Sequence, residues 1–351
     1  MTVDLTVNGT RYRGWQSVEV TRSIEAIAGS FSLAVTERWP GSQARYAISP
    51  GAACTLAADG EALITGHVDT VDVRFDDRGH GVTIAGRDVT GDLVDCSAEA
   101  PGGELRDVTL TQLAARLAQP FGVEVRAETD AGRPFDRITI EPGESAFEAI
   151  ERACRMRAVL PVSDGRGGLL LTTAGQAGRA ATTLAQGQNI LAAGGTYSWR
   201  DRYSTVTVKG QAAGTDSFFG EPAAAAKGRQ ADPAIGRHRP LTVIAEAPGD
   251  DAALAERAAW EVTVRRGRSR SVEITVAGWR MSDGRLWAPN MLVPAVSDWL
   301  GIDQDMLIVS VTYSLDETGT LARLSLMRPD AYALLATPEI APTDPFGEPG
   351  W

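Results

Sequence analysis

The sequence predicts a mainly β protein with a small α+β insert. Apolar residues alternate along many short stretches, turn motifs separate these stretches, and helical spacing is concentrated after residue 101. At 351 residues the chain can hold two or three cores, because single cores stop growing near about 250–300 residues. We expect a first β domain over residues 1–100, a small α+β domain over 101–176, a second β domain over 177–336 and an extended tail over 337–351.

The first hundred residues carry the period-two pattern of half-buried strands. Val3, Leu5 and Val7 alternate with polar residues, and the same spacing recurs over residues 31–35. Asp59-Gly60 lies between two apolar runs and predicts a tight hairpin, because a type I′ turn needs positive φ at both central residues. Many short strands with regular turns predict a small barrel or a sandwich.

The α+β domain is predicted from two helical patterns. Leu110, Leu113 and Leu117 share one helix face, which predicts a helix beginning near Thr109 and ending before residue 122. A second helix is predicted to open at Ser145, where a capping box with the glutamate three residues later can satisfy the first free N–H groups. A glycine-rich turn over residues 164–168 then leads into a strand over 169–171.

The second β domain is predicted to contain one helix and one long loop. The helix spans about 251–266, and strands follow over 272–277, 307–315 and 321–327. Residues 211–236 are rich in Ala, Gly and Pro and predict the loop.

The two β regions end alike. Each has a strand, an acidic glycine-containing turn, a second strand, an arginine–aspartate step (Arg87-Asp88; Arg328-Pro329-Asp330) and an apolar pair. Antiparallel hairpins resemble one another, so both coincidence and duplication explain this similarity.

Composition excludes several classes of protein. The formal net charge of −11 disfavours a protein that grips nucleic acid, because such binding depends on Lys and Arg neutralising phosphates. No run approaches the roughly 18 apolar residues that cross a bilayer, and the N-terminus lacks the features of a signal peptide, so we expect a cytosolic start and no membrane insertion. Cys54, Cys96 and Cys154 are predicted to be buried reduced thiols.

The residues predict no cofactor, no metal site and no catalytic set. There are three histidines, no GxSxG nucleophile elbow and no HExxH zinc motif. Four aspartates, at positions 69, 72, 76 and 77, do not fit a calcium-binding loop and are interpreted as a solvated strand edge. Glu141, Glu144 and Glu148 could form a glycosidase pair, but capping and the helix dipole explain two of them. A cell-wall hydrolase therefore stays the alternative class.

Three tryptophans, Trp279, Trp287 and Trp299, lie in one β-rich stretch without histidine or cysteine. We interpret them as core or interface anchors, with a carbohydrate-binding platform as the alternative. The basic run at residues 265–270 is interpreted as a helix end that can pair with an acidic neighbouring subunit, with contact to nucleic acid as the alternative.

Five segments, in order and spacing, carry a family resemblance. They are Ser23-Ile24-Glu25 with Ala28-Gly29-Ser30-Phe31, Thr90-Gly91-Asp92-Leu93-Val94-Asp95-Cys96-Ser97-Ala98, Glu144-Ser145-Ala146-Phe147-Glu148-Ala149-Ile150, Ala255-Glu256-Arg257-Ala258-Ala259-Trp260-Glu261 and Gly278-Trp279 through Asp298. With these segments the chain resembles the baseplate hub proteins of Mu-like contractile-tailed phages, within a larger late-control family that includes type VI secretion spike hubs.

The resemblance implies two tail-tube-like β-barrel domains and a small α/β domain in each subunit of a homotrimer. It implies a pseudo-sixfold ring that joins the hexameric tail tube to the trimeric central spike and contacts other baseplate proteins. It also implies assembly in the bacterial host cytoplasm, residence in the virion tail, and passage of phage DNA without specific binding. We expect an acidic channel, because acidic groups repel phosphates.

The proline-rich tail is predicted to dock on a neighbouring subunit or on the spike, with Phe346 and Trp351 as anchors. A frayed terminus is the alternative. These two aromatic residues and the three tryptophans above are the interface candidates.

Overall fold

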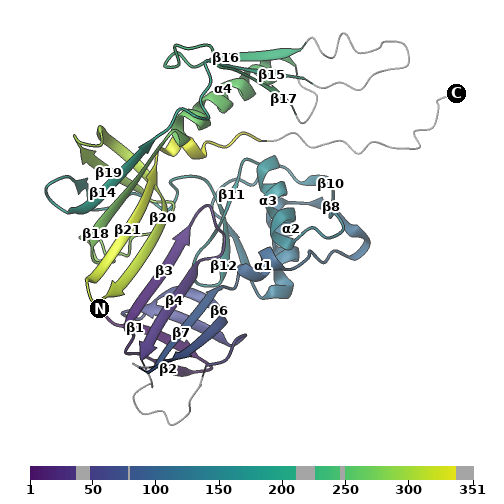
Figure 1. Ribbon diagram of the computed structural model, residues 1–351. Helices are drawn as coiled ribbons and strands as arrows, with labels where there is room; N and C mark the ends of the chain where they lie inside the picture. Colours follow the sequence, from purple (N-terminus) through teal and green to yellow (C-terminus); the bar gives the residue numbers. More distant parts are fainter. Residues whose placement is uncertain (37–47, 78–79, 211–225, 246–249, 337–351) are drawn as a thin grey trace.

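The computed structural model describes residues 1–36, 48–77, 80–210, 226–245 and 250–336. Strand accounts for 47% of the structure and helix for 17%, which confirms the mainly β prediction. Figure 1 shows two long β regions side by side, with a helical unit on one flank and a smaller helix-and-strand unit at one end.

One sheet of thirteen strands runs through both β regions, in the order β14-β18-β21-β20-β3-β4-β7-β6-β5-β1-β2, with β19 and β13 joined at β20. Its strands are β1 (Val3–Val7), β2 (Thr10–Tyr12), β3 (Ser17–Ser23), β4 (Ser30–Thr36), β5 (Ala53–Ala58), β6 (Glu61–Phe75), β7 (His80–Asp88), β13 (Leu184–Ala185), β14 (Ile190–Tyr197), β18 (Arg270–Ala277), β19 (Leu292–Ser297), β20 (Ile302–Asp316) and β21 (Gly319–Met327).

The sheet contains an internal duplication. In chain order, β3 to β7 correspond to β14, β18, β19, β20 and β21, and both sets pair antiparallel in the same spatial order. The matching strands β6 and β20 have 15 residues each, and β7 and β21 have 9 each. Each long strand carries an irregularity near its middle, after Val68 in β6 and after Ile308 in β20. This agreement in topology and register favours duplication over coincidence.

The two repeats join edge to edge. Residues 18–23 of β3 pair antiparallel with residues 310–315 of β20, and the Thr21 and Thr312 hydroxyl oxygens lie 3.1 Å apart. One core extends beneath both repeats, from Leu5 and Leu33 to Val311 and Leu324. The strand pairings of the described residues do not close either repeat into a barrel within one chain. The β regions are therefore halves of one sheet rather than two separately closed barrels.

The hairpin predicted at Asp59-Gly60 is confirmed. Both residues have positive φ, at 50° and 85°, and they connect β5 directly to β6. Glycine and aspartate tolerate this left-handed conformation, which matches the twist of the flanking strands.

A unit with its own core follows the first repeat. It contains α1 (Gly91–Asp95), η1 (Pro101–Gly103), β8 (Glu104–Val108), α2 (Leu110–Ala118), η2 (Gln119–Phe121), β9 (Glu124–Ala127), β10 (Phe135–Thr139), α3 (Ala146–Met156), β11 (Leu160–Ser163) and β12 (Gly168–Thr172). Both predicted helices are present, and the capping box of α3 joins Ser145 and Glu148 as expected. The apolar faces of α2 and α3 are buried in this core, which includes Leu113 and Ile150.

A further small unit lies between the matching strands β14 and β18. It contains β15 (Thr205–Lys209), β16 (Lys227–Ala231), β17 (Pro240–Ile244) and α4 (Asp251–Arg268), and η3 (Pro329–Tyr332) packs against the same helix. The prediction of a loop over 211–236 was wrong at its end, because β16 occupies residues 227–231; residues 211–225 lie outside the described part. Gly228 allows β16 to pack closely against α4, since a Cβ there would lie 2.0 Å from the Leu254 carbonyl carbon.

Candidate assembly interface

The three tryptophans of the candidate interface lie in different environments. Trp279 and Trp287 are buried in the chain's own core. The Trp279 ring lies 5.2 Å from the Tyr313 ring at a tilt of 50° and donates a 2.9 Å hydrogen bond to the Ser314 carbonyl. Their assignment as contact residues for a partner is corrected, because their side chains have no surface to offer. Trp299 lies in the β19–β20 turn and is 87% exposed. Phe346 and Trp351 lie outside the described residues.

Two of the three glutamates of the hydrolase alternative, Glu144 and Glu148, have structural partners for their carboxylates. The Glu144 carboxylate accepts two 2.9 Å hydrogen bonds from Arg152 and one of 3.0 Å from the Glu141 N–H. Burial raises the pKa of Glu144, but these hydrogen bonds outweigh it and hold the pKa below its usual range. Glu148 accepts from the Ser145 N–H at the start of α3. A carboxylate held ionised by an arginine is poorly suited to act as a general acid.

The other polar and thiol side chains considered as site candidates are found in different settings. Among the described residues, no group of three or more His, Cys, Asp or Glu side chains could hold a metal ion. Arg87 pairs with Asp69 at 2.7 Å and with Asp95 at 2.6 Å, so one member of the aspartate cluster is neutralised. Cys54 and Cys154 are buried as predicted, and burial raises the pKa of the Cys54 thiol to about 12. Cys96 is exposed, which corrects its predicted burial.

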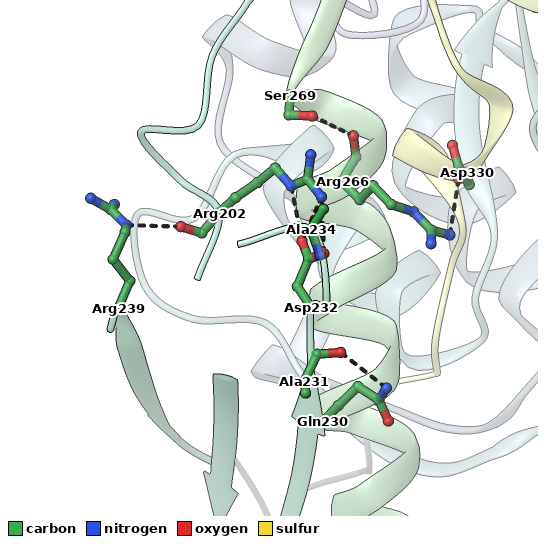
Figure 2. Close-up of polar contacts among 9 residues, drawn as sticks. All are labelled: Arg202, Gln230, Ala231, Asp232, Ala234, Arg239, Arg266, Ser269 and Asp330. Atoms are coloured by element: carbon green, nitrogen blue, oxygen red, sulfur yellow. Dashed lines mark hydrogen bonds and ion pairs between the residues drawn. The ribbon is translucent and has the colours of Figure 1, made fainter. Parts of the chain in front are cut away.

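The basic run at the end of α4 is paired within the chain. Arg265 meets Glu261 at 3.0 Å, one turn earlier on the helix. Arg266 meets Asp330 of η3 at 3.6 Å, and Arg268 donates to the Ala331 carbonyl (Figure 2 shows the Arg266–Asp330 pair). The run therefore fastens α4 to the end of the second repeat, as helix-terminal cations commonly do with acidic neighbours.

A buried ion pair holds the small unit together. Arg202 donates to both Asp232 carboxylate oxygens, with hydrogen bonds of 2.7 to 3.0 Å, and both side chains are buried (Figure 2). Arg239 adds a hydrogen bond from its Nε to the Arg202 carbonyl. Sequence reasoning missed this pair, because nothing local marks two residues thirty positions apart as partners.

Among the unpaired strand edges of the described residues, two in the large sheet carry exposed apolar side chains. One is the outer edge of β14, and the other is the outer edge of β6 from residue 70 to Phe75. Both carry exposed apolar side chains, which are Val73 and Phe75 on β6 and Leu191 and Tyr197 on β14. An exposed edge with apolar side chains favours pairing with another chain. These two edges are the candidate assembly interface.

The comparisons with known proteins agree with this architecture. Sequence families match four consecutive parts: the N-terminal domain of Mu phage baseplate assembly protein GpP-like proteins (residues 2–88), the second domain of gp44-like baseplate hub proteins (90–173), the third domain of NMB1110-like tail proteins (202–259) and the fourth domain of Mu phage baseplate assembly protein GpP (251–335). The baseplate hub protein gp44 of Escherichia phage Mu is 36% identical over 334 residues, which cover 93% of this chain and 87% of that protein. The chain belongs to the baseplate hub family of Mu-like phages.

Solved structures of related proteins share the fold of this hub. The 43 kDa tail protein of prophage MuSo2 from Shewanella oneidensis is 39% identical, with a TM-score of 0.85 over 95% of the hub and 100% of that chain. A tail protein from Neisseria meningitidis MC58 is 25% identical, with a TM-score of 0.80 over 96% of the hub and 99% of that chain. No helix in the described parts of the hub is both long and apolar enough to cross a membrane.

Proposed function

We propose that the hub is a structural adaptor of a contractile tail and forms a homotrimeric, pseudo-sixfold ring. The internal duplication carries this proposal, because three copies of a chain with two similar repeats place six similar units around one axis. Such a ring can meet a hexameric tail tube on one side and a trimeric spike on the other. Closed point-group symmetry is the common arrangement of homo-oligomers.

The face of the sheet opposite the core suits the wall of a channel for DNA. Along the central strands this face carries Thr21, Ser32 and Thr312, and its exposed charges include Glu19 and the ion pair of Glu273 with Arg323. Small hydroxyl groups and acids supply few cations to hold phosphates. We propose that this face lines the channel, where DNA passes without specific binding.

The other parts of the proposal follow from membership of the family. The hub works in the virion tail after assembly in the host cytoplasm, in contact with the tube, spike and other baseplate proteins, and without catalysis or cofactor. The helical units, on one flank and at one end of the large sheet (Figure 1), and the exposed Trp299 are available for those contacts. The two repeats correspond to the two tail-tube-like barrels, and these are completed only when copies of the chain assemble.

Sedimentation and negative-stain microscopy test the ring directly. The expected result is a species of three times 37.2 kDa with a central opening. A chain that stays a monomer or dimer at high concentration would contradict the proposal. Clearing of peptidoglycan by the wild type but not by Glu144→Gln would instead favour the hydrolase alternative.

A further inference from the structure

The α3–α4 groove lies between two units of the chain, the helical unit that contains α3 and the small unit that contains α4 (Figure 1). Its volume is about 600 Å³, and the last described residues of the chain also line it. The apolar part of its lining includes Met156 and Leu160 from the helical unit and Trp260 and Val264 from α4. Apolar side chains from two separate units therefore face one open space.

The described part of the chain ends inside this groove. The Trp260 Nε1 donates a 2.7 Å hydrogen bond to the Ala333 carbonyl and so fixes the chain to α4. Leu334 and Leu335 follow and line the groove, where Leu334 is still 37% exposed. Residues 337–351 therefore start from a point that is already fastened at the groove.

Arginines predominate among the charged residues that line the groove, which has four arginines and two glutamates. Arg152 and Arg257 are paired with glutamates of their own units. Arg155 is 60% exposed and meets Glu151 at 3.3 Å, in a pair that water screens. Arg268 lies over the Tyr332 ring and donates to a backbone carbonyl, and no ion pair joins it to a carboxylate in the described part of the chain. Arg155 and Arg268 are therefore open to a further acidic partner.

The sequence that continues from the groove has the complementary chemistry. Residues 337–351 contain three acidic residues, at positions 339, 344 and 348, and no Lys, Arg or His. Ile340 and Phe346 supply apolar side chains between these acids. Four prolines limit the conformations of the segment, which lowers the entropy that it loses on binding.

Attachment beside the groove favours binding within one chain. A short tether gives an effective concentration on the order of mM, so even a weak contact is populated. Phe346 is ten residues beyond Ala336 and can reach about 31 Å at 3.1 Å per residue. The 18 residues of α4 span about 27 Å at 1.5 Å per residue, so the segment is long enough to follow the groove along α4.

We propose that the α3–α4 groove binds residues 337–351 of the same chain. The acidic residues of this segment meet Arg155 and Arg268, and Phe346 packs among the apolar side chains beside Trp260. The sequence alone predicted a neighbouring subunit or the spike as the partner, but the groove of the same chain is nearer. Binding ties the helical unit, which follows the first repeat, to the small unit within the second repeat. It is a property of one chain and does not depend on the proposed ring.

A photoreactive group at position 346 tests the site in the full chain. Phe346→benzoylphenylalanine keeps an aromatic ring, and on illumination it should form cross-links to peptides of α3 or α4, which mass spectrometry identifies. The product should migrate as one chain of 37.2 kDa on a denaturing gel. A product of twice that mass would place the segment on a neighbouring copy. That result, or a failure to cross-link to α3 and α4, overturns the proposal.

Charge reversal tests the role of the arginines. Arg155→Glu should lower the yield of the cross-link within one chain about fivefold, the largest factor that one exposed ion pair commonly contributes. Arg155→Gln removes the charge without adding a like charge beside Glu151, and should lower the yield by a smaller factor. Arg116→Glu is the matched control, because Arg116 is also an exposed arginine in the last turn of its helix but lies on α2, outside the groove.

Circular dichroism checks that the three variants fold. Equal yields in Arg155→Glu and Arg116→Glu overturn the proposal, because the acidic segment would then not depend on the arginine of the groove. This test and the test of the ring fail separately. A chain that never forms trimers still gives the cross-link within one chain, and trimers whose cross-links avoid α3 and α4 overturn the groove proposal and leave the ring intact.

Discussion

The buried pair of Arg202 and Asp232 makes the small unit sensitive to the loss of one charge. The two side chains are 9% and 5% exposed, and three hydrogen bonds join them. Asp232→Asn keeps the shape but leaves the Arg202 guanidinium without a counter-charge away from water. Removing one partner of a buried pair costs about 3–5 kcal/mol, so we expect a loss of that size.

An exposed pair of similar geometry provides the control. Arg179 and Asp305 also make two hydrogen bonds, of 2.8 and 2.9 Å, but their side chains are 59% and 39% exposed. Water screens this pair, so Asp305→Asn should cost no more than about 1 kcal/mol. The comparison isolates the effect of burial, because both variants replace an aspartate that accepts at least two hydrogen bonds from an arginine guanidinium.

Hydrogen exchange and urea unfolding measure the two effects. The core of the small unit has five buried apolar residues, so few contacts stabilise it. Amides of β15 and β16 should exchange faster in Asp232→Asn, ahead of the large sheet, and stay protected in Asp305→Asn. Equal losses in the two variants, or unchanged protection of β15, would refute the reasoning from burial.

Three more outcomes are expected. Glu144→Gln should lower the free energy of unfolding by about 1–2 kcal/mol at neutral pH. Because the pKa of Glu144 is lowered in the folded protein, this contribution is present above about pH 4.5 and vanishes as the pH falls through the lowered value. The stabilities of the wild type and the variant should therefore converge on acid titration. In the free folded chain an alkylating agent should label Cys96 alone, and after denaturation it should also label Cys54 and Cys154, as mass spectrometry would show. Rapid labelling of all three thiols in the folded chain would contradict the burial of Cys54 and Cys154. Gly267→Ala would bring a Cβ within 2.3 Å of the Ala331 nitrogen and should lower the stability measured in thermal melts by about 1–3 kcal/mol. Gly81→Ala, where a Cβ meets open space, should not lower it. Equal melting temperatures of the two variants would contradict the close packing at Gly267.

The features predicted best from the sequence are those formed by residues close together in the chain. The helix start at Thr109, the capping box at Ser145 and the turn at Asp59-Gly60 are formed by residues within a few positions of one another, and each is present. Their hydrogen bonds and backbone angles need little help from distant parts of the chain.

Structural features that depend on residues far apart in the chain were not predicted from the sequence. β16 is a strand because β15 pairs with it, although its own residues, Lys227–Ala231, have little β preference. Trp279 is buried because Tyr313 and the second repeat enclose it, and aromatic content alone cannot separate a core from an interface. The duplication was faint because matching positions hold unrelated residues, such as Val20 and Gly195, under the same backbone pairing.

The joint between β3 and β20 also governs the order in which the chain can fold. β3 is synthesised almost three hundred residues before its partner β20, so the outer edge of β3 is unpaired during most of synthesis. Contacts that span such a distance slow the search for the native state, because the loop must close before the pairing stabilises it. The first repeat must therefore persist as a partly finished sheet, and a chaperone that shields its edge would raise the yield of soluble chain.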